Sequence, residues 1–204
     1  QTISLTPSTY QSGTAWFSNM VLNANDFDLV TYAQADLTYA KEQGLEAAIA
    51  AAIIADAGIT QSVATATTSG FTYENLVDLN RKLPRKYDRQ KVIVLSAQAY
   101  AAAEKLVGDD GHPVLNKDPQ NAELLRFNGT PVLRCDDFEA FGAGKVIGCI
   151  FSMIGFSLRD AGQASLARYT QNAAKPDQTG FNLFAYHAYG YAASAIAKLI
   201  CPAS

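Results

Sequence analysis

The spacing of apolar residues between positions 26 and 57 predicts one long helix. Small and apolar residues recur there at intervals of three and four, the spacing of one helical face: Val30, Ala33, Leu37, Ala40, Gly44, Ala48, Ala51 and Ala55. Asn25 is a suitable N-cap, and Gly58 is expected to end the helix. At ~1.5 Å per residue the helix would be roughly 48 Å long. We therefore expect an elongated, flat subunit, or a kink at Gly44.

Short apolar runs in the middle of the chain predict a small buried sheet. They lie at residues 92–95, 131–133 and 146–151. Ser96 is placed to cap a helix over residues 97–107. Because this pattern layers helices on a sheet, the fold class is α+β.

The segment before this sheet is predicted to hold a polar linker and a second helix. Residues 60–70 are polar and form the linker. Residues 72–83 are amphipathic, and the helix is expected to stop before Pro84.

The two ends of the chain are predicted to be extended. Residues 1–10 alternate between apolar and polar, which is typical of a half-exposed strand, and a short helix is expected over residues 15–22. Near the C-terminus, residues 165–171 and 181–191 predict a long aromatic hairpin, and residues 195–200 predict a final strand.

Composition changes this picture mainly through the small number of charges. The 204 residues are 49% hydrophobic but only 17% charged, with a net charge of -3, whereas globular domains average about 25% charged residues. Surfaces poor in charge suit packing against other subunits. The lack of a basic excess argues against a dedicated nucleic-acid binder. The most apolar run, residues 45–54, contains Glu46 and is too short to span a membrane.

One basic cluster stands out against this acidic background. Arg81, Lys82, Arg85 and Lys86 lie close together, and Arg89 and Lys91 follow them. The cluster either contacts a polyanion or is a solvated helix end and loop, and the sequence leaves both interpretations open.

No arrangement of residues predicts an active site, a cofactor or a metal. Asp109 and Asp110 with His112 have turn chemistry, and the acidic residues Asp136, Asp137 and Glu139 lack a partner at motif spacing. The three cysteines, Cys135, Cys149 and Cys201, are expected to be buried thiols. A small hydrolase-like enzyme remains the alternative, and it requires Asp136, Asp137 and His112 to converge in one pocket.

The order of these elements resembles the major capsid proteins of tailed bacteriophages, the Hong Kong 97 fold. Three local segments carry the resemblance: KVIVLSAQAY at residues 91–100, LVGDDGHPVL at residues 106–115 and FNGTPV at residues 127–132. The first is similar to that family's strand-then-helix step, the second to the turn that follows it, and the third to a characteristic strand entry. The likeness extends over nearly the whole chain.

The resemblance implies a long spine helix, a small α+β axial domain, a peripheral domain with a long β-hairpin, and a partial extended loop. The loop would be residues 1–17, the peripheral domain residues 18–67 and 152–193, and the axial domain residues 68–151 and 194–204. Only the second strand of the extended loop is present, so the likeness is to an N-terminally truncated member.

The function implied by the resemblance is structural. Subunits would assemble with themselves into pentamers and hexamers of an icosahedral shell around double-stranded DNA, in the host cytoplasm and then in the virion. Scaffolding protein, portal and maturation protease would be further partners. An encapsulin-type bacterial compartment enclosing protein cargo is the alternative. The candidate assembly contacts are Ile3, Leu5, Tyr10, Trp16 and Phe17.

Overall fold

The computed structural model shows two compact units. Unit 1 consists of Gln1–Ile3, Ala48–Ser157 and Gly190–Ser204, and unit 2 of Ser4–Ala47 and Leu158–Tyr189. The residues that the structure describes are 8–11, 14–22, 29–108, 111–119, 121, 124–160, 164–170, 174 and 176–203.

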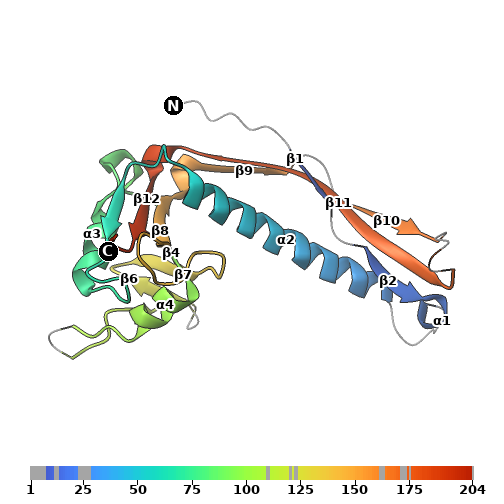
Figure 1. The fold of residues 1–204 in the computed structure, drawn as a ribbon, viewed down its shortest axis with the longest axis horizontal. Helices are drawn as coiled ribbons and strands as arrows, with labels where there is room; N and C mark the ends of the chain where they lie inside the picture. Colours follow the sequence, from blue (N-terminus) through green and yellow to red (C-terminus); the bar gives the residue numbers. More distant parts are fainter. Residues whose placement is uncertain are drawn as a thin grey trace. The chain divides into compact units, whose positions relative to one another are not determined.

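A seven-stranded mixed sheet forms the centre of unit 1 (Figure 1). In spatial order the strands are β3 (Ser62–Ala64), β12 (Ile196–Ile200), β8 (Val146–Ser152), β4 (Lys91–Leu95), β7 (Thr130–Arg134), β6 (Leu125–Phe127) and β5 (Asn116–Lys117). Strands β12, β8 and β4 pair antiparallel, while β3 joins β12, and β7 joins β4, in parallel.

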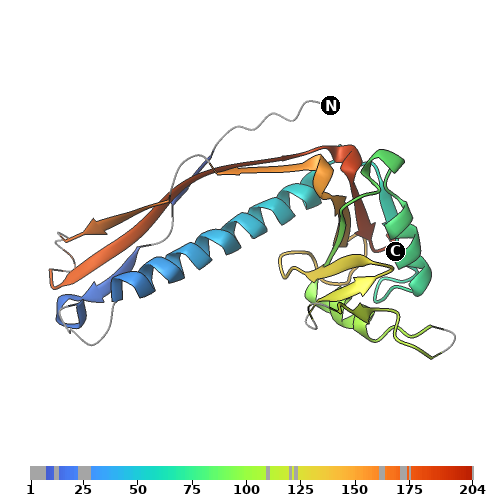
Figure 2. The same ribbon diagram turned by 180° about the vertical axis from the view of Figure 1, so that it is seen from behind.

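Two helices cover one face of this sheet. Helix α3 (Tyr73–Arg81) buries Leu76 and Leu79, and helix α4 (Ala97–Glu104) buries Ala99 and Ala103, in one core cluster with the strands. In Figure 2 the yellow strand β7 lies beside the yellow-green helix α4. The small alanine side chains let α4 lie close to the strands.

The opposite face of the sheet packs against the end of helix α2 (Leu29–Ala55). Ala50 and Ile53 from the helix share a buried cluster with Cys149 and Ile196 from the strands. The sheet is thus apolar on both faces, as expected for strands whose sequences are continuous apolar runs.

A lysine from the sheet ends helix α2. Lys198 is 7% exposed, and its ammonium group donates hydrogen bonds to the carbonyls of Ile54 (2.9 Å) and Asp56 (2.8 Å). These carbonyls have no later helical N–H to accept from, so a cation from β12 supplies the missing donors.

Unit 2 is built around strand β11 (Gln178–Tyr191), which pairs antiparallel with β1 (Ser8–Gln11), β2 (Ala15–Ser18) and β10 (Ser165–Tyr169) and also pairs with β9 (Phe156–Asp160). Its small core joins Ala33 and Leu37 of α2 to Phe181 and Leu183 of β11. Helix α1 (Asn19–Leu22) follows β2.

Most of the predicted elements are confirmed. The long helix is uninterrupted over 27 residues and contains Gly44. The three apolar runs are β4, β7 and β8, the aromatic hairpin is β10 with β11, and the last strand is β12. Ser96 caps α4 by accepting from the Ala99 N–H at 3.4 Å.

Three local predictions were wrong. Residues 15–18 form a strand, because they pair with β11, and only Asn19–Leu22 are helical. Residues 60–70 are not simply a linker, since β3 lies within them and buries Val63. Helix α2 ends at Ala55 under the Lys198 ammonium, three residues before Gly58.

Several predictions concern residues that the structure does not describe. Ile3 and Leu5, the helix cap Asn25, and Asp109 and Asp110 all lie outside the described residues. The three-part division into loop, peripheral and axial domains stays a prediction.

Candidate functional site

The predicted basic cluster forms one exposed segment of unit 1, residues 81–91, called here the basic segment. Arg81 ends α3 and Lys82 is its C-cap, while Arg85 and Lys86 belong to the 3-10 turn η1 (Arg85–Tyr87). A cation at a helix C-terminus is favoured by the helix dipole, which explains Arg81 and Lys82 locally but not the residues that follow.

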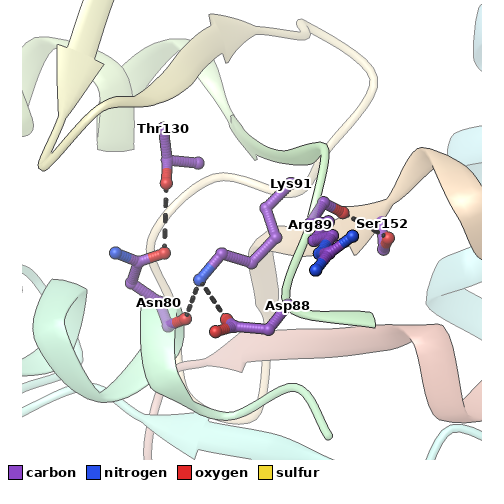
Figure 3. Close-up of polar contacts among 6 residues, drawn as sticks. All are labelled: Asn80, Asp88, Arg89, Lys91, Thr130 and Ser152. Carbon is purple, nitrogen blue, oxygen red and sulfur yellow. Dashed lines mark hydrogen bonds and ion pairs between the residues drawn. The ribbon is translucent and has the colours of Figure 1, made fainter. Parts of the chain in front are cut away.

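A polar network fixes the backbone of this segment (Figure 3). Lys91 Nζ donates to the Asn80 carbonyl at 2.8 Å and to Asp88 Oδ1 at 2.7 Å. The Thr130 hydroxyl donates to Asn80 Oδ1 at 3.2 Å, and the Ser152 hydroxyl donates to the Arg89 carbonyl at 2.8 Å. The segment is therefore tied to α3 and to β8, and α3 is in turn tied to β7.

The only carboxylate in the basic segment is already engaged. The hydrogen bond from the Lys91 ammonium, with its charge, holds the pKa of Asp88 below its ordinary value. The Lys86 ammonium lies 4.7 Å from the centre of the Tyr87 ring. Arg81, Lys82, Arg85 and Arg89 are exposed and make no ion pair with any described residue.

The predicted assembly contacts that the structure describes pack within unit 2. Trp16 and Phe17 are half-buried in β2. The Phe17 and Phe181 rings are 6.0 Å apart, and a Cβ on Gly180 would lie 2.9 Å from Trp16 Cζ3. Tyr10 pairs with Ala185 through the backbone of β1. Their contact with a neighbouring subunit stays a prediction.

Sequence reasoning missed a second set of exposed apolar residues in unit 2. Met20 and Val21 on α1 are 81% and 50% exposed, and Tyr32 and Tyr39 on α2 are 55% and 60% exposed. Tyr39 also lines a shallow groove of about 470 Å³ along α2. The sequence could have identified these residues only as large side chains on a periodic helix face for which it predicts no packing partner.

Two of the three acidic residues at positions 136–139 form ion pairs, namely Asp136 of the enzyme alternative and Glu139. Arg134 donates to both oxygens of Asp136, at 2.7 and 2.9 Å, which lowers the pKa of that carboxyl. Lys145 Nζ donates to Glu139 at 2.6 Å and lowers its pKa in the same way. The carbonyl of His112 accepts from the Gly108 N–H at 2.8 Å, which is turn geometry as predicted.

The cysteines are core residues. Cys135, Cys149 and Cys201 are at most 5% exposed and form no disulfide, as predicted. Burial raises the pKa of Cys149 to about 12, so the thiolate needed for nucleophilic chemistry is strongly disfavoured.

Among the described residues, no helix combines the length and apolar character needed to cross a bilayer.

Solved structures share this fold at low sequence identity. The capsid of an empty gene transfer agent particle matches with a TM-score of 0.73 and 21% identity, covering 98% of this chain and 73% of that one. Microbacterium phage Oxtober96 matches with a TM-score of 0.70 and 11% identity over 97% and 73% of the two chains. Gordonia phage Cozz matches with a TM-score of 0.66 and 10% identity over 98% and 71%. These likenesses establish the Hong Kong 97 fold predicted from the order of elements.

The family assignment comes from the sequence itself. No curated protein matches the chain significantly. The phage capsid family, by contrast, matches over residues 3–200, nearly the full length. This match favours the viral interpretation over the encapsulin and enzyme alternatives. The chain belongs to the phage capsid family and is a structural capsid protein of the virion, not an enzyme.

Proposed function

We propose that this chain is the major shell subunit of a tailed phage, a prophage or a gene transfer agent, assembling with itself into pentamers and hexamers around double-stranded DNA. The family match over residues 3–200 carries the proposal. The C5 symmetry with which the capsid of the empty gene transfer agent particle was computed supports the pentamers. Scaffolding protein, portal and maturation protease remain predicted partners.

The exposed surface of unit 2 supports assembly. A monomer that stays alone rarely displays many large apolar side chains in one small unit, yet Met20, Val21, Tyr32 and Tyr39 are each at least half exposed. Closed rings need heterologous contacts, in which one face of a subunit meets a different face of the next. These residues are suitable centres for such a face.

The edge of β1 is a second candidate contact. Among the described strands, β1 pairs only with β11, so its outer backbone groups are available for another strand. We expect amide hydrogen exchange in Ser8–Gln11 to slow on assembly, with Trp16 and Phe17 becoming less accessible. Unchanged exchange between subunits and shells would argue against this contact.

Negative-stain microscopy of the purified full chain, together with sedimentation velocity, tests the proposed function. Rings or closed shells are expected. A chain that sediments only as a monomer over the whole accessible concentration range would contradict the proposal. Shells that contain protein cargo and no nucleic acid would instead support the encapsulin alternative.

A further inference from the structure

The charge of the chain is divided very unevenly. The basic segment holds six cationic residues and one carboxylate, a local charge of +5, whereas the whole chain has a net charge of -3. The remaining residues therefore carry -8. A nucleic acid near this protein is repelled by most of the chain, and attraction can come only from a region such as this segment.

The cations are presented outward on a fixed backbone. Leu83 is 5% exposed and anchors the segment in the core. The Tyr87 N–H donates to the Pro84 carbonyl at 2.8 Å, which closes the turn, and the network of Figure 3 holds both ends. Because the backbone is ordered before any ligand arrives, little further backbone entropy is lost on binding.

The side chains have few competing partners within the subunit. Asp88 is occupied by Lys91. Asp78 lines the same groove of about 490 Å³ as Arg81 and Lys82 but forms an ion pair with neither of them. Arg81, Lys82, Arg85 and Lys86 are exposed and form no ion pair with the part of the chain that the structure describes, so they are placed to meet a polyanion.

The chemistry of the segment favours phosphates over a protein surface. Its two large apolar residues, Leu83 and Tyr87, are buried and half-buried, so the exposed side chains are almost entirely cationic. Protein interfaces have apolar or aromatic centres and few lysines, whereas contacts to a DNA backbone need only well-placed cations.

We infer that the basic segment contacts the phosphate backbone of the double-stranded DNA enclosed by the shell, through Arg81, Lys82, Arg85 and Lys86. The inference rests on the proposed function. The contact is independent of sequence, because phosphates carry no base information.

The test compares two variants that remove the same number of charges. The first replaces Arg81, Lys82, Arg85 and Lys86 with Gln. The control replaces four other exposed cations with Gln, namely Lys105, Lys117, Arg159 and Arg168. Fluorescence anisotropy of labelled double-stranded DNA is measured for the wild-type full chain and both variants over a series of salt concentrations.

We expect the first variant to bind DNA about tenfold or more weakly at moderate salt, with the slope of log Kobs against log salt reduced by about 0.9 for each lost contact. The control is expected to behave like the wild type. Wild-type DNA binding that is absent, or equal losses in both variants, would overturn the inference. If the first variant unfolds at a lower temperature, the double variant Arg85→Gln/Lys86→Gln, outside any α-helix, replaces it.

A second measurement separates this inference from the proposed function and from a protein contact. Rings and shells of the first variant are expected to form as in the wild type. Their loss, with DNA binding retained, would make the segment a subunit interface and overturn the inference.

Met153 and Ile154 are exposed beside the segment, where the Met153 N–H donates to the Gln90 carbonyl at 3.0 Å. Met153→Ser/Ile154→Ser should leave DNA binding unchanged, and a loss equal to that of the first variant would also contradict the phosphate contact. Failure of wild-type shells to form, with DNA binding intact, would count against the proposed function alone.

Discussion

Unit 1 and unit 2 bury their apolar residues to different extents. Unit 1 contains two core clusters, with eighteen and eight buried residues, and unit 2 contains one cluster with four. Of the thirteen exposed large apolar side chains among the described residues, eight belong to unit 2, the smaller unit. Unit 1 is therefore stabilised mainly by its own core, while unit 2 exposes apolar surface, which we propose meets neighbouring subunits.

The two units reach this difference through their strands and helices. The strands of unit 1 are covered on both faces, by α3 and α4 on one side and by the end of α2 on the other. In unit 2, Ala33 and Leu37 face the sheet, but Tyr32 and Tyr39 on the same helix are exposed. A stripe of small residues allows close packing but buries little area per residue.

The largest predicted effect is in the core of unit 1. A Cβ on Gly148 would lie 2.5 Å from the Val94 carbonyl oxygen and 2.9 Å from Leu95 Cδ2, so the backbones of β4 and β8 would have to separate. We expect Gly148→Ala to lower the free energy of unfolding by about 3 kcal/mol or more, measured by urea denaturation. Gly70→Ala is the control, because its nearest neighbour would be 3.7 Å away. Equal stability of both variants would contradict the tight packing of unit 1.

The next effect concerns the lysine that ends α2. Lys198→Met keeps the length of the side chain but removes the ammonium donor from the carbonyls of Ile54 and Asp56, and Asp56 keeps only the long hydrogen bond from the Ile59 N–H at 3.4 Å. We expect the free energy of unfolding to fall by about 2 kcal/mol, because hydrogen bonds to charged groups are stronger than average. The loss is no larger because the variant no longer has to bury an ammonium group. Lys105 is exposed, so Lys105→Met should change stability by less than about 0.5 kcal/mol. A similar melting temperature for both variants would show that Lys198 does not hold the helix end.

The sequence predicted the elements with strong periodicity and failed where pairing between distant segments decides the structure. Helix α2 and strand β8 are long or strongly apolar, and both were found. Residues 62–64 are exposed at two of three positions, and their strand forms only because β12 lies beside them. Similarly, residues 15–18 are extended because β11 supplies their hydrogen bonds.

The candidate site was predicted only as a list of charges. The cluster from Arg81 to Lys91 is visible in the sequence, but the sequence does not distinguish a polyanion contact from a solvated helix end and loop. The network that orders it joins Asn80, Thr130 and Ser152, which are up to 72 positions apart in the chain. No spacing rule brings such residues together, so the fixed backbone of the segment could be recognised only from the fold.

A third prediction tests whether the exposed residues of unit 2 serve assembly. Met20→Ser/Val21→Ser should leave the free energy of unfolding of the monomer within about 0.5 kcal/mol, because both side chains are at least half exposed. We expect ring or shell formation to require at least about tenfold more protein, which corresponds to about 1.4 kcal/mol. Sedimentation velocity over a concentration series measures this. Met153→Ser/Ile154→Ser is the matched control in unit 1, and an equal defect in it would remove the distinction between the units.

The smallest predicted effect compares one ion pair from each unit as the pH falls. In unit 1, Glu139 accepts from Lys145 Nζ at 2.6 Å and from the Val146 N–H at 2.8 Å, whereas in unit 2 Lys41 Nζ and Asp160 Oδ1 are 3.8 Å apart. The hydrogen bond from Lys145 is the main cause that lowers the pKa of Glu139, and burial opposes it.

A carboxyl whose pKa is lower in the folded state contributes stability above its unfolded pKa, near pH 4.3 for Glu, and loses that contribution as the pH falls through the folded pKa. We therefore expect Glu139→Gln to be less stable than the wild type by about 0.5 kcal/mol at pH 6, the range of a partly exposed pair. The difference should shrink as the pH falls through the folded pKa of Glu139, where the wild-type carboxyl becomes protonated. Urea midpoints across this range measure both, and Asp160→Asn should show no comparable change because its pair is longer and its carboxylate is 58% exposed. If the stability difference between Glu139→Gln and the wild type were independent of pH, the contribution of Glu139 to stability would come from its shape rather than its charge. The ion pair of unit 1 would then not stabilise the fold through ionisation.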